Sequence, residues 1–425
     1  MRPIYLGNDK WEKNQIHLNL VSAMNPHAIV TGPSGSGKTH TLRYLANQLA
    51  LMGARVYLFD VHGDLNIGNS LCSTVKFSET SPYGINPLKI SADPDYGGVR
   101  KKIRNFVAML NRTSRKLGPK QESVMINLLR DLYSANGFYE GDLKTWGLDF
   151  DPRHKSRSGK KYPTMQDLER FAGYKLKQLL AGAGSKAYAA IAEIEKIHAR
   201  LKRAAKNHEE EKLNALKEKY LASCREFVEN IETGREMDDY IKYDSKEPMK
   251  STYDRIVNLN SSGIFKSMEP KFDPTLPVHR YDISALSTDE QKIFIDIVAE
   301  EIFLDRRQRG IVSMPDTFIF IDEAKHFISS EPDHIVNILF TDARKFGIGA
   351  ILGSQSITHF TEDILQSAAT KIVLGLDDTF HSKAERLLKV DAKRFGYIVP
   401  QETALVQIRE SGGKSSKYRD MILGY

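Results

Sequence analysis

Apolar residues near the start of the chain alternate between short runs and a helical spacing. The run His27–Gly32 (HAIVTG) leads directly into a glycine-rich loop, and apolar residues then recur at intervals of three and four through Thr39–Met52. Gly53 is suited to end that helix, and Arg55–Asp60 (RVYLFD) is a second apolar run. A strand, a loop, a helix and a strand in so few residues form a βαβ unit. This unit predicts a parallel sheet that is covered by helices.

The strand pattern is lost from about 101 to 265, where helices and basic loops are expected. Ser185–Thr233 carries two apolar stripes at intervals of three and four, one on either side of Asn207–Glu211. The stripes are Ile191, Ile194, Ile197 and Leu201, then Leu213, Leu216, Tyr220, Cys224, Phe227 and Ile231. They predict an antiparallel helical hairpin, because the repeat is too short for a long coiled-coil arm. Pro152–Pro163 (PRHKSRSGKKYP) has no acidic residue and is interpreted as an exposed basic loop.

Strands and helices alternate again from about 266 onwards. The expected strands are Val278–Ile283, Thr317–Asp322, Ala350–Ser354, Lys371–Leu376 and Ala404–Ile408, and the expected helices are Asp289–Arg309, Ile335–Lys345 and Ile364–Ala369. These signals predict one α/β sheet built by residues 1–100 and 266–425, with residues 101–265 inserted as an all-helical subdomain. No internal repeat or low-complexity tract interrupts this organisation.

Composition adds little to this picture but excludes some classes of protein. The chain of 425 residues is 41% hydrophobic and 27% charged, which is enough to bury a core and argues against disorder. The formal net charge of +7, from 61 basic and 54 acidic residues, suits a nucleic-acid partner and equally suits an ordinary basic surface.

Cysteine usage and hydropathy predict a cytoplasmic protein. Cys72 and Cys224 have no metal-ligand spacing and form no disulfide framework, which fits a reducing compartment. The N-terminus has no apolar signal core, and no run of about 18 apolar residues occurs that would span a membrane. Work at a membrane would therefore need a partner protein that holds the chain there.

The glycine-rich loop matches the phosphate-binding pattern G-x-x-x-x-G-K-[ST]. Its glycines allow backbone N–H groups to point at phosphates, and the helix that follows adds the positive end of its dipole. A lysine reaches the β- and γ-phosphates and a hydroxyl binds Mg²⁺. A chance glycine turn is disfavoured because the motif lies between a strand and a helix. The candidate ATP-binding residues are Gly32, Pro33, Ser34, Gly35, Ser36, Gly37, Lys38, Thr39 and His40.

Two carboxylates end the apolar strand of the third region. Asp322 is placed to hold Mg²⁺ through water, and Glu323 to polarise the water that attacks the γ-phosphate. A strand followed by an acidic helix start is common and would explain the pair by itself. The phosphate loop in the same chain favours the catalytic interpretation.

Further polar residues follow strand ends and are candidates with alternatives. Gln355 could sense the γ-phosphate or simply cap its strand. Arg344 could supply positive charge to a neighbouring subunit's ATP, or interact with a helix dipole. Asp60, His62 and Asp64 could contact the metal or the attacking water, or could form a turn with the intervening glycine.

The chain resembles the HerA/FtsK superfamily of DNA-pumping ATPases, most closely its HerA-like, conjugation and type IV secretion branches. The resemblance is carried by the phosphate loop and by three further motifs in a fixed order, and it covers about half of the chain. These motifs are DVHGDL at 60–65, FIFIDEAKH at 318–326 and ARKFGIGAILGSQS at 343–356. Shorter similarities lie at 85–87, 163–168 and 281–286.

The resemblance implies a RecA-like core with the phosphate-loop strand next to the Asp322 strand, and a hexameric ring with ATP between subunits. In that family pattern Asp322 matches the magnesium ligand and Glu323 the catalytic carboxylate. Arg344 matches the arginine finger and Gln355 the γ-phosphate sensor. DNA would pass through a channel that is lined by basic loops.

The sequence departs from the family in lacking room for an N-terminal β-barrel, and in showing no membrane segment or separate DNA-orienting domain. A minimal motor that depends on a partner protein is therefore expected. The first hypothesis is an ATP-driven DNA translocase, with Pro152–Pro163 as one candidate grip on the phosphate backbone. The alternatives are an ATPase that energises type IV secretion or conjugation without pumping DNA, and a regulatory ATPase of a defence nuclease complex.

Overall fold

The computed structural model describes residues 2–68, 70–113, 115–152, 159–181, 186–207, 209–231, 234, 242–243, 246–266, 268–332, 334–412 and 417–425. The chain divides into two compact units. One unit is Met1–Ile85 together with Lys266–Tyr425, and the other is Asn86–Phe265. Over the described ranges, no helix combines the length and apolar character that crossing a membrane requires.

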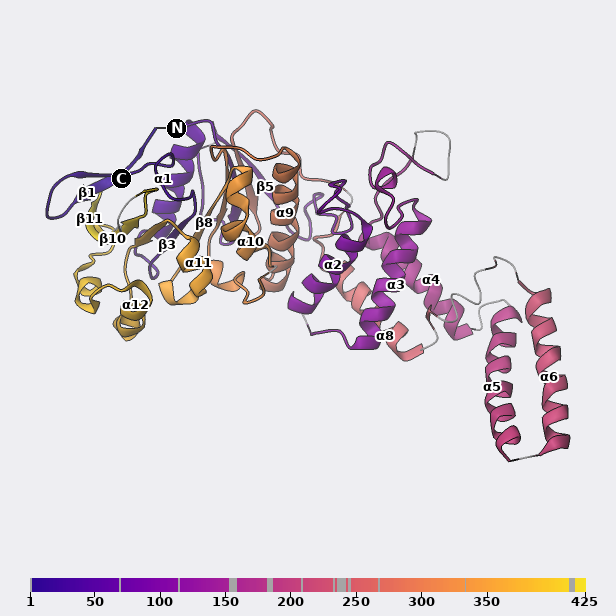
Figure 1. The fold of residues 1–425 in the computed structure, drawn as a ribbon. Helices are drawn as coiled ribbons and strands as arrows, with labels where there is room; N and C mark the ends of the chain where they lie inside the picture. Colours follow the sequence, from indigo (N-terminus) through magenta and orange to yellow (C-terminus); the bar gives the residue numbers. More distant parts are fainter. Residues whose placement is uncertain are drawn as a thin grey trace. The chain divides into compact units, whose positions relative to one another are not determined.

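The first unit is built on a sheet of mixed direction. Across the described residues the sheet has 11 strands in the order β2-β1-β11-β10-β9-β3-β8-β7-β4-β6-β5 (Figure 1). Their bounds are β1 Ile4–Asp9, β2 Gln15–Leu18, β3 Ala28–Thr31, β4 Arg55–Asp60, β5 Cys72–Lys76, β6 Val278–Asp282, β7 Thr317–Ile321, β8 Ile348–Ser354, β9 Thr370–Val373, β10 Thr403–Ile408 and β11 Arg419–Leu423. Neighbours from β9 to β5 are parallel, whereas those from β2 to β9 are antiparallel. The expected α/β class with a mainly parallel sheet is confirmed.

Helices cover both faces of this sheet. Successive side chains along each strand point to opposite faces, and apolar side chains on both faces pack against these helices. In β4, Val56 and Leu58 join a buried cluster that includes the apolar side of α1 (Lys38–Leu51). Phe59 points to the other face, where its ring lies 6.4 Å from Phe294 of α9 (Thr288–Gln308). The remaining helices of this unit are α10 Ile335–Thr341, α11 Glu362–Ser367 and α12 His381–Leu388. The β-strands β3, β7 and β8 are buried along their whole lengths, which places the phosphate loop on a rigid base.

The strand order corrects one expectation. The phosphate-loop strand β3 does not neighbour the Asp322 strand β7, because β8 pairs with both and lies between them. Glycines allow this close approach: a Cβ at Gly349 would lie 2.5 Å from the Phe318 ring, and one at Gly353 would lie 2.6 Å from a carboxylate oxygen of Asp322. The expected helix over Ile335–Lys345 also ends early, and a 3-10 turn covers Ala343–Phe346.

The second unit is helical, as expected for the insertion. Its helices are α2 Val99–Thr113, α3 Pro119–Ala135, α4 Met165–Ala181, α5 Lys186–Lys206, α6 Glu210–Glu229 and α8 Lys246–Asn260. Helices α5 and α6 lie side by side, joined at one end, and Ile197, Ala204 and Leu216 form a small buried cluster between them (Figure 1). The predicted helical hairpin is confirmed. The ends of the predicted span, Ser185 and Thr233, lie outside the described residues.

One boundary of the helical unit and one residue of its predicted basic loop differ from the sequence interpretation. Residues 86–100 lie with the helical unit and not with the sheet, since Leu88 is buried there and its carbonyl accepts a 2.7 Å hydrogen bond from the Tyr133 hydroxyl. Residues 153–158 of the predicted basic loop lie outside the described residues. Lys160 from the same segment is buried, and its ammonium donates to the carbonyls of Thr145 and Phe150 at 2.7 Å. Lys160 is therefore not part of an exposed basic surface.

Candidate functional site

The phosphate loop closes tightly between β3 and α1. Gly35 and Gly37 have φ angles of 80° and 94°, in the left-handed region that favours glycine. A Cβ at Gly32 would lie 2.2 Å from the Ser36 hydroxyl oxygen, so only glycine fits there. Because Gly37 immediately precedes α1, the first N–H groups of the helix face the space above the loop. The loop therefore has the backbone form of an anion-binding site.

A cavity of about 610 Å³ lies above this loop. That volume is in the range of small-molecule and cofactor sites. Most of the predicted site residues meet there, including both carboxylates after β7 and the polar residues after β4 and β8. The lining residues are Pro33, Ser34, Gly35, Gly37, Lys38, Thr39, His40, Thr41, His62, Asp64, Asp322, Glu323, Gln355, Gln401, Leu423 and Tyr425.

Lys38 is held by the two acidic residues. Its ammonium lies 2.7 Å from Glu323 Oε1 and 3.3 Å from Asp322 Oδ1, and all three side chains are nearly buried. Glu323 has φ 48°, a left-handed conformation that costs about 1–3 kcal/mol for a residue other than glycine. A phosphate group would compete for Lys38, and a divalent cation would compete for the carboxylates.

The pKa values of the two carboxyl groups are shifted in opposite directions. Burial raises the pKa of Asp322, although Lys38 and the Glu323 N–H oppose the rise. Burial also acts to raise the pKa of Glu323, but the Lys38 hydrogen bond and charge, together with Gln355, outweigh it and lower that pKa. Glu323 is therefore a carboxylate at neutral pH. Its Oε2 atom is buried and, among the described residues, has no hydrogen-bond partner, although the Lys325 ammonium lies 3.8 Å away. This oxygen can accept a hydrogen bond from a water molecule.

The rim residues converge on this pair. Gln355 donates to Glu323 Oε1 at 3.4 Å, and His62 Nε2 lies 3.8 Å from the same oxygen with 57% of its side chain exposed. The Thr39 hydroxyl donates to Asp64 at 3.4 Å. The segment after β4 thus places His62 beside Glu323 and Asp64 beside the Thr39 hydroxyl.

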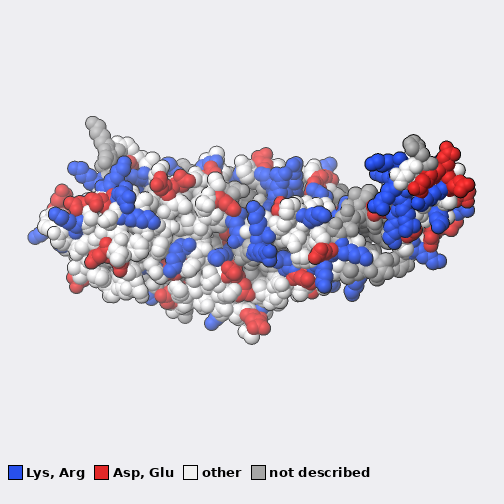
Figure 2. Space-filling model, turned by 90° about the horizontal axis from the view of Figure 1, so that it is seen from below, with Lys and Arg blue, Asp and Glu red and all other residues white. Residues whose placement is uncertain are grey.

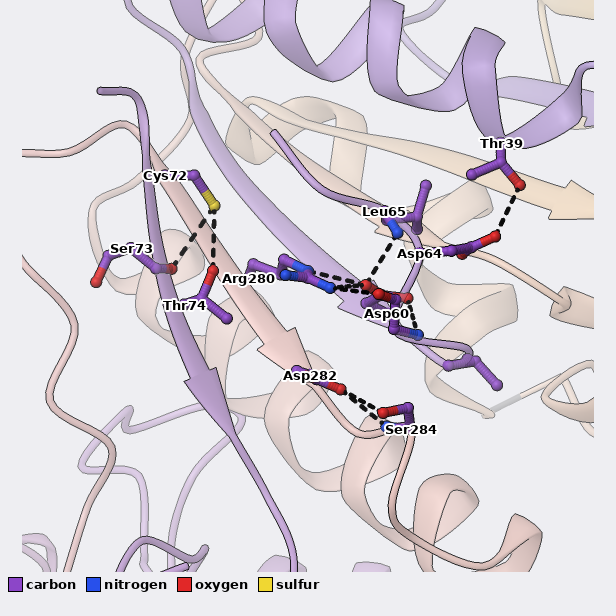
Figure 3. Close-up of polar contacts among 12 residues, drawn as sticks. Thr39, Asp60, Asp64, Leu65, Cys72, Ser73, Thr74, Arg280, Asp282 and Ser284 are labelled. Carbon is purple, nitrogen blue, oxygen red and sulfur yellow. Dashed lines mark hydrogen bonds and ion pairs between the residues drawn. The ribbon is translucent and has the colours of Figure 1, made fainter. Parts of the chain in front are cut away.

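Asp60 does not reach the cavity. Figure 3 shows its carboxylate enclosed by Arg280 of β6 and by the backbone of its own loop, while Asp64 points towards Thr39. The fully buried carboxylate accepts from the N–H groups of Gly63 at 2.7 Å and Leu65 at 3.0 Å, and from Arg280 Nε at 2.8 Å. Of the two roles that the sequence left open for Asp60, the buried carboxylate and its donors favour the turn over a contact with metal or water. Asp60 instead fixes the turn that presents Asp64.

Replacing Arg280 with methionine is expected to lower the free energy of unfolding by about 3–5 kcal/mol, since the buried charge of Asp60 would lose its partner. Chemical denaturation of the full chain measures this change. Arg309→Met is the matched control, because Arg309 pairs with Asp305 at 2.7 Å on the surface, with 61% of its side chain exposed. Equal losses in the two variants would contradict the assignment of Arg280 as the residue that holds this turn.

Arg344 lies far from the cavity of its own chain. It sits in the 3-10 turn before the first residue of β8, whereas Gln355 follows the last residue of the same strand. A seven-residue strand spans roughly 20 Å at about 3.3 Å per residue, so Arg344 lies at the opposite edge of the sheet. The Arg344 side chain is exposed. The pKa of neighbouring His27 is lowered to about 3, mainly because His27 is buried and to a smaller extent because of the positive charge of Arg344. Arg344 can therefore not serve an ATP bound in the same chain.

Sequence reasoning missed one wall of the cavity. Thr41, Gln401, Leu423 and Tyr425 line it, and the Gln401 amide donates to the Gly35 carbonyl at 2.8 Å. No motif marks these positions, because the last three come from the antiparallel side of the sheet, far along the chain.

The side chains that line the cavity limit how a metal ion could be bound there. Among the residues that the structure describes, no three His, Cys, Asp or Glu side chains cluster in a way that could bind a metal ion. Thr39 and Asp322 are the two oxygen ligands that the sequence predicts for a metal, and both line the cavity. This arrangement fits Mg²⁺, which keeps several waters and is held by one or two protein groups together with substrate phosphates.

Comparison with known proteins agrees with this geometry. Residues 6–76, from β1 to β5, match the family model described as helicase HerA-like C-terminal. The DNA import protein CedB of Sulfolobus acidocaldarius is 35% identical over 141 residues, which are 32% of this chain and 22% of CedB. The match therefore spans about a fifth of that relative.

Solved structures resemble nearly the whole chain. VirB4 of Thermoanaerobacter pseudethanolicus superposes with a TM-score of 0.65 and 14% identity, over 99% of this chain and 96% of VirB4. The plasmid coupling protein TrwB, in complex with the ATP analogue ADPNP, superposes with a TM-score of 0.56 and 14% identity, over 100% of this chain and 95% of TrwB. TrwB has also been solved with ADP and Mg²⁺, and that form has a TM-score of 0.51. At this level of identity the likeness establishes the fold.

Proposed function

Because this chain carries an ATPase core of the HerA/FtsK superfamily, we propose that it hydrolyses ATP with Mg²⁺ and uses the energy to move DNA. The expected superfamily is confirmed; the DNA substrate and the assembly are proposals. The observation that carries the catalytic part is the 2.7 Å contact of Lys38 with Glu323 Oε1 above the phosphate loop. The other carboxylate oxygen, Oε2, has no hydrogen-bond partner among the described residues and lies 3.8 Å from the Lys325 ammonium.

Each residue of the cavity has a role in this proposal. Lys38 would leave Glu323 to bind the β- and γ-phosphates. Thr39 and Asp322 would hold a magnesium ion, which would supply positive charge against the phosphates. Glu323 would accept a hydrogen bond from the attacking water through Oε2. Gln355 and His62, both beside Glu323, contact the γ-phosphate or that water. Asp64, which accepts a hydrogen bond from the Thr39 hydroxyl, would help to orient that hydroxyl for the metal.

The position of Arg344 supports an assembly of several copies. An exposed guanidinium at the sheet edge opposite the phosphate loop is available to a neighbouring chain and not to its own. We therefore propose a homo-oligomer, a hexameric ring, in which each ATP lies between two subunits. Arg344 then contributes positive charge to the transition state in trans.

DNA is supported as the substrate by charge and by the homologue's description. CedB is described as a DNA import protein. Helix α2 has no acidic residue, and its basic residues Arg100, Lys101 and Arg104 are exposed. Figure 2 shows other Lys and Arg side chains interspersed with Asp and Glu on the face drawn. The exposed basic residues of α2, and not the mixed charge of the face drawn, suit contacts with a phosphate backbone without reading of base sequence.

Steady-state ATP hydrolysis, measured with and without DNA at low and high salt, tests the proposal. We expect DNA to stimulate hydrolysis several-fold and the stimulation to fade with salt, since each neutralised phosphate steepens the salt dependence by about one unit in log–log slope. Glu323→Gln serves as the blank. Hydrolysis that is indifferent to DNA would exclude the translocase and favour an ATPase of secretion or of a nuclease complex.

A further inference from the structure

The strand order fixes the direction in which a nucleotide lies across the cavity. Glu323 and Gln355 follow β7 and β8, which lie on one side of the phosphate-loop strand β3. The γ-phosphate of a bound nucleotide therefore faces that side. Its ribose and base must extend over the other side, where β9, β10 and β11 follow in the sheet. The cavity is lined there by Gln401, before β10, and by Leu423 and Tyr425, at the end of β11.

This second wall carries a fixed aromatic platform. The Tyr425 ring stacks on Tyr44 with centroids 4.1 Å apart and planes 6° apart, and it lies nearly parallel to His40 at 5.7 Å and 11°. The Tyr425 hydroxyl donates to Thr41 Oγ1 at 3.0 Å, and the Tyr44 hydroxyl donates to the Tyr5 carbonyl at 2.6 Å. The rings are therefore held in place by hydrogen bonds from both phenols. Burial raises the pKa of Tyr425 to about 12, so its phenol stays neutral.

Gln401 connects the platform to the phosphate loop. Its side chain donates to the Gly35 carbonyl at 2.8 Å and its backbone N–H to the Ser36 carbonyl at 3.3 Å. Its φ of 65° is a left-handed conformation that is uncommon outside glycine, asparagine and aspartate. The residue thus lies between the phosphate end and the aromatic end of one continuous cavity. An anion-binding surface and an aromatic surface therefore share this space.

We infer that the Tyr425 platform binds the base of the nucleotide by stacking, and that it makes the site select purine over pyrimidine nucleoside triphosphates. The inference rests on the proposed ATPase function and adds the base subsite to it. A purine offers a larger π-face than a pyrimidine, so it gains more from stacking on the same aromatic ring. Packing of the chain end against α1 is the alternative role for the same ring.

Calorimetric titration of the full chain with ATP, UTP and inorganic tripolyphosphate separates these roles. We expect the parent to bind ATP about tenfold more tightly than UTP. Tyr425→Ala should weaken ATP binding about tenfold, remove the preference over UTP and leave tripolyphosphate binding unchanged. Tyr425→Phe keeps the ring without the hydroxyl and should restore ATP affinity. Thermal melting and tripolyphosphate binding show whether the alanine variant keeps its phosphate loop folded.

The outcomes distinguish this inference from the proposed function. Equal affinities of the parent for ATP and UTP would overturn the base subsite, and this measurement needs no variant. ATP binding that survives Tyr425→Ala unchanged would also overturn it, while the phosphate loop remains a nucleotide site. Failure of the parent to bind either ATP or tripolyphosphate would overturn the ATPase proposal itself and the inference with it.

Discussion

Replacing Glu323 with glutamine is expected to lower kcat for ATP hydrolysis by about 10²–10³-fold, with little change in ATP affinity. General-base contributions are typically about 10²–10⁴-fold. The amide has nearly the shape of the carboxylate but cannot accept a proton from water, and it no longer holds Lys38 as an ion pair across 2.7 Å. Phosphate release at saturating ATP gives kcat, and titration with a fluorescent ATP analogue gives affinity.

The exposed Glu362 at the start of α11 provides a matched control for this change. Glu362→Gln removes the same charge away from the cavity and should hydrolyse ATP like the parent. A parental rate in Glu323→Gln would show that another group activates the water. Loss of ATP binding together with hydrolysis in that variant would show instead that Glu323 maintains the form of the phosphate loop.

The core of the site could be predicted from sequence because its signals are local. The strand Arg55–Asp60 has the expected bounds, and α1 begins one residue from the expected start. A phosphate loop depends on glycines and a lysine within eight residues, and its flanking strand and helix are adjacent in sequence. Asp322 and Glu323 follow directly from the apolar run before them. Parallel strands bring their carboxyl ends to one edge, so these groups meet whatever the order of the strands.

The antiparallel part of the sheet could not be predicted in the same way. Strands β1 and β11 pair across nearly the whole chain, as in the alignment of Gly7 with Leu423. Nothing in a local pattern specifies such a partner. Tyr425 therefore has no visible role in the sequence, although it lines the same cavity as Lys38.

The fate of Asp60 illustrates a second limit of sequence reasoning. Asp60 and Asp322 are the same residue type at the same position relative to their strands. Asp322 lines the cavity, whereas Asp60 is buried in an ion pair with Arg280. What separates them is Arg280 on the neighbouring strand β6, which is distant in sequence and registers opposite Leu58. Burial of a carboxylate requires donors, and only the assembled sheet shows which carboxylate has them.

Replacing Arg344 with alanine is expected to lower kcat by about 10³-fold at saturating ATP, because an arginine finger contributes about 10³–10⁵-fold in related chemistry. ATP affinity should change little, since the residue lies at the sheet edge opposite its own phosphate loop. Lys345→Ala is the matched control. Lys345 is the next residue and is also exposed. Its ion pair in the described part of the chain is with surface Asp342, at 3.6 Å.

Mixing two inactive variants tests whether Arg344 acts on a neighbouring subunit. Lys38→Ala subunits should not bind ATP but still present Arg344, whereas Arg344→Ala subunits bind ATP and lack the guanidinium. Where the ATP of an Arg344→Ala subunit faces a Lys38→Ala neighbour, the interface regains every group, so hydrolysis should reappear in the mixture. Differently tagged variants that co-purify establish that mixed assemblies form. Co-assembly without any recovered hydrolysis would contradict action in trans, and unimpaired hydrolysis by Arg344→Ala alone would remove Arg344 from the mechanism.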